Sequence, residues 1–194
     1  MSPTIREVPA GEAPMELLLL ADPSEEKVRS YLPESRCFVA ARHGVVVGAC
    51  VVQPRGAGAH EIMSIAVDPG CQKSGYGTAL LKWVVDHYRG SGARQLEVGT
   101  GTFGYQLAFY QRLGFRVTSI DPDFFVENYP EPIFENGIQL FDMLRLTLRY
   151  SPDPEADDLV VVGRFLEPFD AHVVAGALEA AGLVATIRQE QVAG

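Results

Sequence analysis

The sequence predicts an α/β domain, α+β by some schemes, followed by a short C-terminal βαβ appendage. Three observations carry this prediction. Apolar segments typical of strands alternate with segments whose apolar residues recur at helical spacing. Two neighbouring apolar segments are joined by a tight turn containing glycine, which is typical of antiparallel strands. An acidic stretch with two prolines near residue 150 then separates this pattern from a shorter one of the same kind.

The first part of the chain predicts a strand, two helices and a three-strand meander. Ile5 to Val8 is typical of a strand, and Met15 to Ala21 of a short core helix too short to cross a bilayer. Ser24 can cap a helix that reaches Tyr31, with acidic residues in its first turn. The meander is expected at 37–41, 45–52 and 60–67, with a tight turn at 42–44 and a loop at 54–58.

Two further helices and three further strands follow the meander. The apolar spacing predicts a helix from Gly75 to about Arg89, ended by Gly90-Ser91-Gly92. The remaining elements are expected to be a strand at 95–98, a helix at 105–113 stopped by Gly114, and strands at 115–120 and 137–148 joined by a long loop.

The domain organisation follows from a change in composition. We expect a main domain at 1–150, an acidic proline-containing linker at 151–158 and a small βαβ appendage at 159–194. In the appendage a helical face is expected between strands at 159–162 and 183–187; the face consists of Ala171, Val174, Ala175 and Leu178. A unit of about forty residues is near the lower limit for an independent core. It is therefore expected to dock on the main domain or on a second copy, which would make a homodimer.

Charge and cysteine content narrow the classes of partner. The formal net charge is −9, and eight of the 25 acidic but only two of the 16 basic residues follow Tyr150. Nucleic acid is not an expected partner, because its phosphates are held by basic patches. Cys37, Cys50 and Cys71 lack the spacing of a disulfide framework or a metal site, which favours a reducing, cytoplasmic setting. The N-terminus has no basic region followed by a long apolar run, so no membrane association is expected.

The segment from Val67 to Gly77 is the most informative part of the chain. It joins the apolar strand at 60–67 to the helix from Gly75 through a turn that contains three glycines. Free amides at a helix N-terminus, together with the helix dipole, bind phosphate, and glycine lets the backbone approach it closely. The segment therefore predicts a phosphate site, to which Lys73 can add charge; the alternative is an ordinary helix start with a solvated lysine.

Two motifs carry a resemblance to a known family. Gln72-Lys73-Ser74-Gly75-Tyr76-Gly77 matches the Gln/Arg-x-x-Gly-x-Gly/Ala acetyl-CoA motif of the GNAT acetyltransferase superfamily, and Val67-Asp68-Pro69 stands where that family ends its central strand. Ala108-Phe109-Tyr110-Gln111-Arg112-Leu113-Gly114-Phe115 resembles its second signature. The resemblance covers roughly Thr4 to Arg149. It implies a mixed, mostly antiparallel central sheet flanked by helices. The tail resembles more weakly a small signal-transducing domain family.

The resemblance also implies an activity: direct transfer of an acetyl group from acetyl-CoA, as co-substrate, to a primary amine. Pantetheine would pair with the open edge of the central strand at Ile65, Ala66 and Val67, where an N–H can also polarise the thioester carbonyl. The pyrophosphate would bind the amides of Gln72, Lys73, Ser74, Gly75, Tyr76, Gly77 and Thr78. Glu61 is the candidate base, acting through water, and Tyr110 the candidate acid that protonates the thiolate.

Each catalytic candidate has a structural alternative. Tyr110 can be a core aromatic, because Leu107 and Leu113 lie at helical spacing from it. Glu61 can be the outward-facing polar residue of a half-buried strand. Cys71 lies beside the motif, but direct transfer needs no nucleophilic thiol. The four histidines are far apart in sequence and more typical of surface or satisfied polar positions; they are His43, His60, His87 and His172.

The loop at 121–136 is the candidate acceptor site. It contains five acidic and four aromatic residues and no lysine or arginine, which would suit a cationic amine. The candidates are Phe125, Glu127, Tyr129 and Glu131, and the alternative is a solvated acidic connection. The acceptor is expected to be a small molecule, and the alternative is a protein. The competing hypothesis from another class is a catalytically idle acyl-CoA-binding module whose tail contacts a partner.

Overall fold

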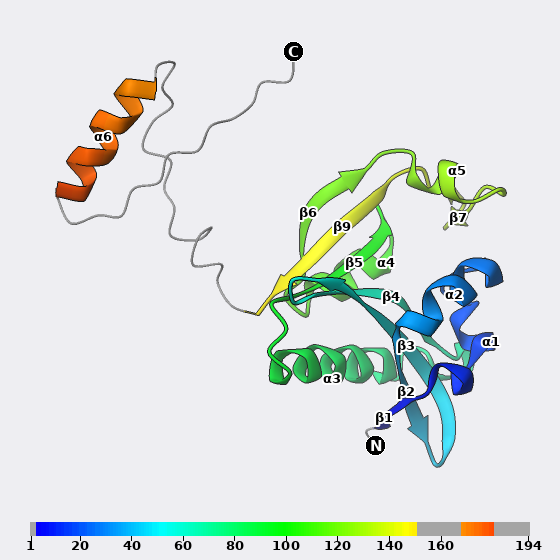
Figure 1. Ribbon diagram of the computed structural model, residues 1–194. Helices are drawn as coiled ribbons and strands as arrows, with labels where there is room; N and C mark the ends of the chain where they lie inside the picture. The colour runs from blue at the N-terminus through cyan, green and yellow to red at the C-terminus, as the bar shows by residue number, and fades with distance from the viewer. Residues whose placement is uncertain (1–2, 151–167, 181–194) are drawn as a thin grey trace. The chain divides into compact units, whose positions relative to one another are not determined.

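The computed structural model describes residues 3–150 and 168–180. The chain divides into two units, 1–152 and 153–194, which are treated separately. Within residues 3–150 the first unit contains nine strands: β1 Thr4–Val8, β2 Arg36–Arg42, β3 Val45–Gly56, β4 Ala59–Val67, β5 Gln95–Gly101, β6 Arg116–Asp121, β7 Phe134–Glu135, β8 Ile138–Gln139 and β9 Met143–Arg149. Its α-helices are α1 Met15–Leu18, α2 Glu25–Tyr31, α3 Tyr76–Gly90, α4 Tyr105–Gln111 and α5 Phe124–Asn128 (Figure 1). Among the described helices none is long and apolar enough to span a membrane.

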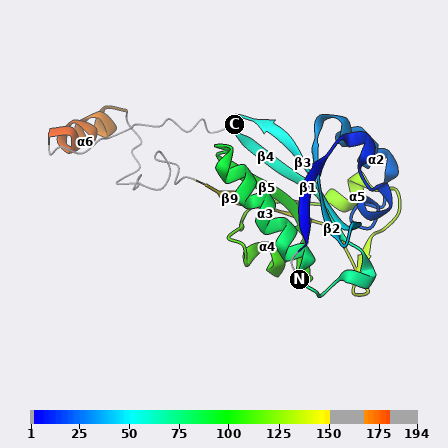
Figure 2. The ribbon, with the colours of Figure 1, turned by 90° about the horizontal axis from the view of Figure 1, so that it is seen from below.

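The main sheet is mixed and mostly antiparallel. Its seven strands run in the order β1-β2-β3-β4-β5-β9-β6, and among these neighbours only β4 and β5 are parallel. Helices α3 and α4 cover one face and α1, α2 and α5 lie on the other (Figure 2). A buried apolar cluster lies on each face, one beneath α3 and one beneath α1 and α2. The predicted fold class is therefore confirmed for this unit.

Turn chemistry explains the meander of β2, β3 and β4. His43 and Gly44 both have positive φ angles, 50° and 82°, which is the backbone of a two-residue type I′ hairpin turn. The predicted loop at 54–58 is wrong: β3 continues to Gly56, and the turn contains only Ala57 and Gly58. Pro54 misled the interpretation. It is tolerated in the strand because β2 pairs with β3 only as far as Val52, which leaves this end of β3 with a neighbour on one side.

The central strand β4 separates from β5 part of the way along its length. It pairs with β3 from Ala59 to Val67 but with β5 only from Ala59 to Ile62. Met63 is the extra residue of a bulge, since Ile62 pairs with Val52 and Ser64 with Val51. Beyond the bulge, β4 has a strand on one side and an open edge on the other. We call this gap between β4 and β5 the splay.

The segment between β6 and β9 has more structure than the sequence predicted. The expected loop contains α5, and the expected strand at 137–148 is divided into β8 and β9. Asn136 and Gly137, with φ angles of 52° and 77°, form the turn of the small β7–β8 hairpin. An Asn-Gly pair is a strong hairpin signal, and treating it as the end of a loop meant that the β7–β8 hairpin was missed. Backbone bonds from Phe125 to Phe141 and from Leu140 to Ile133 then fold the segment onto itself.

In the second unit the structure describes one helix, α6 Pro168–Ala180. It contains the helical face predicted around Val174. The predicted strands at 159–162 and 183–187 and the linker at 151–158 lie outside the described residues. The domain boundaries stay a prediction.

Candidate active site

The turn between β4 and α3 is held in shape by its own polar groups. The Asp68 side chain accepts a hydrogen bond from the Gly70 amide at 2.8 Å, and the Asp68 carbonyl accepts one from Cys71 at 2.8 Å. These bonds form a short 3₁₀ turn over Pro69–Cys71. The chain is thereby directed from the end of β4 to the start of α3.

Successive backbone amides are left unpaired where the turn enters α3. The first helical hydrogen bond runs from the Ala79 amide to the Gly75 carbonyl at 2.9 Å. The amides of the first three helical residues, 76–78, therefore have no acceptor within the helix. The amides at 73–75 also donate to no acceptor among the described residues. Lys73 and Gly75 have φ angles of 57° and 84°, and such left-handed residues among ordinary ones make successive N–H groups converge on an anion. A Cβ at Gly75 would meet nothing within 4 Å, so the backbone here is open to a ligand.

Gln72 has a different role from its neighbours. Its amide nitrogen already donates to the Pro69 carbonyl, at 3.4 Å, so the unpaired amides begin at Lys73. Its side-chain nitrogen donates to the Val67 carbonyl at 3.1 Å. The glutamine of the motif therefore fixes the end of β4 relative to the turn.

The open edge of β4 presents backbone groups at alternating residues. The Asp68 amide donates to Val47 of β3, so the backbone groups of Val67 and Ile65 face away from β3, toward the splay. Ala66 lies between them and is directed at β3. The strand thus offers the backbone edge that the sequence predicted at 65–67, with the Val67 carbonyl already engaged by Gln72.

Tyr110 lies on α4 in the cluster beneath α3. It is 6% exposed, and its ring contacts Phe109 and Phe115 at centroid distances of 5.3 and 5.8 Å. Burial is the main cause that raises the pKa of Tyr110, with smaller contributions from Cys50 and Tyr105. Cys50 is the strand partner of Ile65, so the Tyr110 ring lies on the α3 side near the splay. Its hydroxyl makes no hydrogen bond within the described residues.

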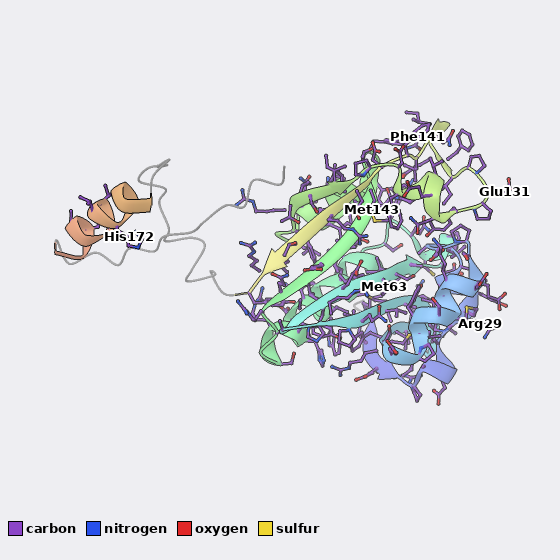
Figure 3. The ribbon with its side chains drawn as sticks, turned by 45° about the horizontal axis from the view of Figure 1, so that its top comes forward. Arg29, Met63, Glu131, Phe141, Met143 and His172 are labelled. Carbon is purple, nitrogen blue, oxygen red and sulfur yellow. The ribbon has the colours of Figure 1, made fainter. Side chains whose placement is uncertain are left out.

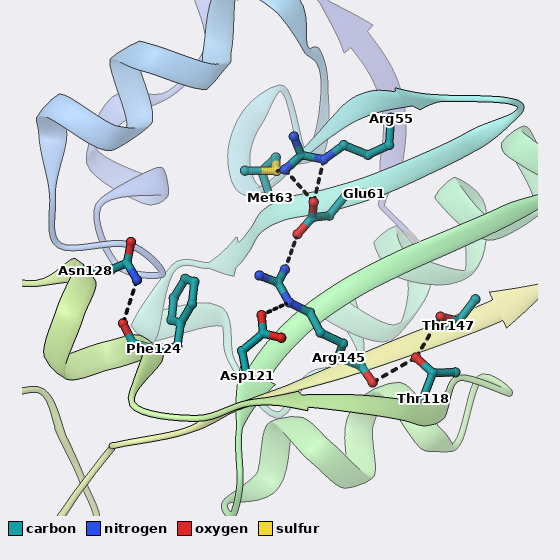
Figure 4. Close-up of polar contacts among 9 residues, drawn as sticks. All are labelled: Arg55, Glu61, Met63, Thr118, Asp121, Phe124, Asn128, Arg145 and Thr147. Carbon is teal, nitrogen blue, oxygen red and sulfur yellow. Dashed lines mark hydrogen bonds and ion pairs between the residues drawn. The ribbon is translucent and has the colours of Figure 1, made fainter. Parts of the chain in front are cut away.

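Glu61 lies on the opposite face, in a network of charged groups (Figure 4). The residue is 8% exposed. One carboxylate oxygen accepts from Arg55 Nε at 2.6 Å and the other from Arg145 Nη1 at 2.8 Å. Arg145 also donates through Nε to Asp121 at 2.7 Å. Glu61 thus joins β3, β4 and β9 through two arginines, and a water bound to Glu61 would have to share these oxygens.

A cavity of about 420 Å³ opens on this face of the sheet, between β4, β5 and the helices α2 and α5. A second opening of about 370 Å³ lies beside β6, and both openings are lined by Glu61, Arg55 and Arg145. The charged residues of the first cavity are Asp22, Lys27, Arg55, Glu61 and Arg145. Its other lining residues are Ser30, Tyr31, Gln53, Ile62, Met63, Gly99, Phe124, Tyr129 and Met143. Because Ile62 is where β4 leaves β5, the cavity reaches the splay.

The predicted acceptor loop contributes aromatic rings to this cavity and not carboxylates. Tyr129 lines it, and Phe125 stacks on Tyr129 at 6.1 Å. Glu127 and Glu131 are exposed and outside the lining, and Glu131 lies at the outer edge of the segment, away from Met63 and Met143 (Figure 3). The expected cation–π position on Tyr129 is occupied by Lys27, whose Nζ lies 3.6 Å from the ring centroid.

Several lining residues were missed by the sequence interpretation, among them Lys27, Phe124 and the two arginines. They belong to α2, α5, β3 and β9, and no local spacing connects them. The remaining candidates lie elsewhere. Burial raises the pKa of Cys37 to about 11 and also that of Cys50, whereas Cys71 is half-buried. Within residues 3–150 and 168–180 no group of three metal-ligating side chains is found.

Known proteins resemble this chain over the first unit. The family model for the acetyltransferase (GNAT) family matches residues 7–115. The uncharacterized N-acetyltransferase YvbK of Bacillus subtilis (strain 168) is 42% identical over 134 residues, which are 69% of this chain and 86% of that protein.

Solved structures of acetyltransferases are also similar to this chain. An IAA acetyltransferase from Bacillus cereus ATCC 14579 is 43% identical, with a TM-score of 0.73 over 76% of this chain and 99% of that one. A GNAT family acetyltransferase from Elizabethkingia anophelis, solved with acetyl-CoA bound, is 41% identical, with a TM-score of 0.72 over 75% and 97%. A Bacillus subtilis acetyltransferase solved with CoA is 40% identical, with a TM-score of 0.69 over 75% and 99%.

Proposed function

Because the chain belongs to the acetyltransferase (GNAT) family and is an acetyl-CoA-dependent acyltransferase, we propose that it acetylates the primary amine of a small molecule by direct transfer. The observation that carries this proposal is the splay of the sheet. It has unpaired amides at the start of α3 on one side and a cavity of small-molecule size on the other. A donor and an acceptor bound on opposite faces can meet only through such a gap.

The residues of this chain fit acetyl-CoA at both ends. The convergent amides from Lys73 to Thr78 would hold the pyrophosphate, with the Lys73 side chain available for added charge. The backbone of Ile65 and Val67 would hold the pantetheine, and an N–H at this edge would polarise the thioester carbonyl. Acetyl-CoA supplies an activated acyl group whose departure leaves a thiolate.

Tyr110 is the proposed acid for that thiolate. Because burial raises its pKa, the phenol keeps its proton through neutral pH and up to at least its usual range near 10. A hydroxyl in this state donates to a developing negative charge. Its position on the α3 face near the splay is the support for this role.

Glu61 is the proposed base, acting through water. The amine must lose a proton during transfer, and Glu61 is the carboxylate that β4 places in the cavity beside Ile62. The two arginines fix the position of its oxygens. Tyr110 and Glu61 then act from opposite faces, with the acceptor amine between them.

Substitution of Tyr110 by Phe tests the catalytic part of the proposal. We expect kcat to fall by about 10²- to 10³-fold, the usual scale for removing a general acid, while the Kd of acetyl-CoA is retained. Tyr88→Phe is the matched control, since Tyr88 is also a buried tyrosine on this face but belongs to the core beneath α3. Steady-state kinetics and calorimetric binding give the two readouts. For the wild type, kcat should show no alkaline loss below about pH 10, because the raised pKa keeps Tyr110 protonated there.

Two results would contradict the proposal. Unchanged turnover in Tyr110→Phe would make Tyr110 a core aromatic only. Acetyl-CoA binding by the intact protein, without transfer to any member of a broad amine panel, would favour the idle acyl-CoA-binding module.

A cytoplasmic setting and a homodimer are further parts of the proposal. Three free cysteines, two of them buried with raised pKa values, fit a reducing compartment. The dimer is proposed to form through the appendage, because a unit of this size is near the lower limit for an independent core and is expected to pack on another surface.

A further inference from the structure

The carboxylates of the acceptor cavity are all engaged by protein groups. Asp22 Oδ1 accepts from the Ser24 amide at 3.0 Å and from the Tyr129 hydroxyl at 3.4 Å. Glu61 accepts from Arg55 and Arg145. Both oxygens of Glu61 are thus taken by arginines, and among these carboxylate oxygens only Asp22 Oδ2 has no partner within the described residues, whereas the three cations of the cavity are Lys27, Arg55 and Arg145. This differs from the cationic acceptor that the acidic loop suggested.

One cation of the cavity has no carboxylate partner. Lys27, on the first turn of α2, is half-buried, and in the described part of the chain no acidic group lies within ion-pair distance of it. Its Nζ is positioned by aromatic faces, 3.6 Å from the Tyr129 centroid and 6.0 Å from that of Phe124. Such contacts hold an ammonium in place while leaving its N–H donors available.

Arg55 adds a second donor to the same cavity. Its side chain is 42% exposed although it pairs with Glu61, and its Nη2 has only the Met63 sulfur as a further partner, at 3.5 Å. A guanidinium can bind two carboxylates, because it carries five N–H donors. The unsatisfied donors of the cavity are therefore cationic, on Lys27 and Arg55.

The lining also includes apolar side chains beside polar ones such as Ser30 and Gln53, and the cavity volume is small. Met63, Met143 and Phe124 provide apolar surface in the cavity, which is also lined by Ile62 at the start of the splay. A volume of about 420 Å³ lies within the range of small-molecule sites. A ligand that fills it presents an anion to Lys27, an apolar body to the methionines, and its amine to the splay.

We propose that the acceptor is an amine that also carries a carboxylate, in the manner of an α-amino acid with an apolar side chain, and that Lys27 and Arg55 bind this carboxylate. The inference rests on the proposed N-acetyl transfer and specifies its substrate class. Glu127 and Glu131, which are exposed and outside the lining, then have no part in binding the substrate.

Matched pairs of acceptors test the inference. Phenylalanine and 2-phenylethylamine differ only in the carboxylate, as do leucine and 3-methylbutylamine. In the wild type we expect kcat/KM for the amino acid to exceed that for the amine by about 10- to 100-fold, the scale of a hydrogen bond to a charged group. In Lys27→Met this ratio should fall toward one, mainly through KM, and Lys27→Arg should restore part of it.

A matched lysine on the other face provides the control. Lys82 is exposed on α3 and is outside the cavity, so Lys82→Met should leave the ratio as in the wild type. Acetyl-CoA affinity, measured by calorimetry for each variant, checks that the fold and the cofactor side are intact. Calorimetric binding of each acceptor to the CoA-saturated protein gives a readout that does not require turnover.

The outcomes separate the two proposals. Equal use and equal binding of both members of a pair, a preference for the bare amine or a diamine, or a carboxylate preference that survives Lys27→Met would overturn the inference while leaving N-acetyl transfer in place. Absence of turnover with Lys27-dependent binding of the amino acid would support the inference and contradict the proposed function.

Discussion

The two faces of the splayed sheet are built in different ways. On the α3 face the predicted acetyl-CoA site consists of backbone amides from consecutive residues between Gln72 and Ala79. On the other face the proposed acceptor cavity consists mainly of side chains from α2, β3, β4, α5 and β9, far apart in sequence. The first is specified by backbone conformation and the second by side-chain identity.

This difference predicts how each face responds to substitution. A site made of amides depends on φ angles and on the space above the backbone, so it tolerates many side chains. A site made of paired charges depends on each partner, because removing one leaves another unsatisfied.

The largest effect is expected on the cofactor face, at Gly75. Gly75→Val places a branched side chain at a φ of 84°, in the left-handed region, and in the open space above the unpaired amides. We expect the Kd of acetyl-CoA to rise by about 100-fold or more, equivalent to losing two hydrogen bonds to a charged phosphate. Calorimetry with acetyl-CoA measures it.

Gly92→Val is the control that separates the effect of backbone strain from the loss of acetyl-CoA binding. Gly92 has a similar φ of 77° and equally open surroundings, but it follows the C-terminal end of α3. Both variants should lose roughly 1–2 kcal/mol of unfolding free energy, the cost of a non-glycine residue in this region. Only Gly75→Val should lose acetyl-CoA. An equal fall in affinity in both variants would mean that general destabilisation explains the result.

A smaller effect is expected at Glu61, where Glu61→Gln removes the charge and keeps the shape. If Glu61 acts as base, kcat should fall by about 100-fold, because the amide cannot take a proton through water. Asp121→Asn is the comparison, since Asp121 also holds Arg145 but lies on β6 and contributes no proposed chemistry. Its effect should be roughly tenfold or less and mainly in KM. Both are measured as pH profiles of kcat and kcat/KM.

The same pair of variants can reverse the assignment. If Glu61→Gln and Asp121→Asn change kcat and KM alike, with the same pH profile, Glu61 positions the arginines and is not the base. The acceptor amine would then enter as the free base. The contrast between the faces would hold, but the cavity would provide binding only.

The contrast also explains what could be predicted from the sequence. The meander and the turn between β4 and α3 depend on neighbouring residues, such as the positive φ pair His43-Gly44 and the helix start at Gly75. Local sequence patterns therefore predict both of them. The open edge of the central strand was implied by the family resemblance, whereas no local signal predicted the bulge at Met63. The Glu61 network joins residues up to 84 positions apart, and no spacing rule brings Arg145 to Glu61. The composition of the acidic loop does not show which side chains point inward: Glu127 is exposed while Tyr129 lines the cavity.

The smallest effect is expected at Gly77, the second glycine of the acetyl-CoA motif. A Cβ there would lie 3.4 Å from Val67 Cγ2 and 3.8 Å from Phe109 Cζ, which are ordinary van der Waals contacts. Gly77 is in the first turn of α3 and, unlike Gly75, does not have a positive φ angle. Gly77→Ala should therefore raise the unfolding free energy by up to about 1 kcal/mol, through helix propensity, and change the Kd of acetyl-CoA by less than about threefold. Urea denaturation and calorimetry measure the two quantities. A fall in affinity as large as that of Gly75→Val would show that the ligand also approaches the backbone at Gly77 too closely for a methyl group. A near-neutral result would mean that, of the two motif glycines, only Gly75 is required, because of its left-handed backbone.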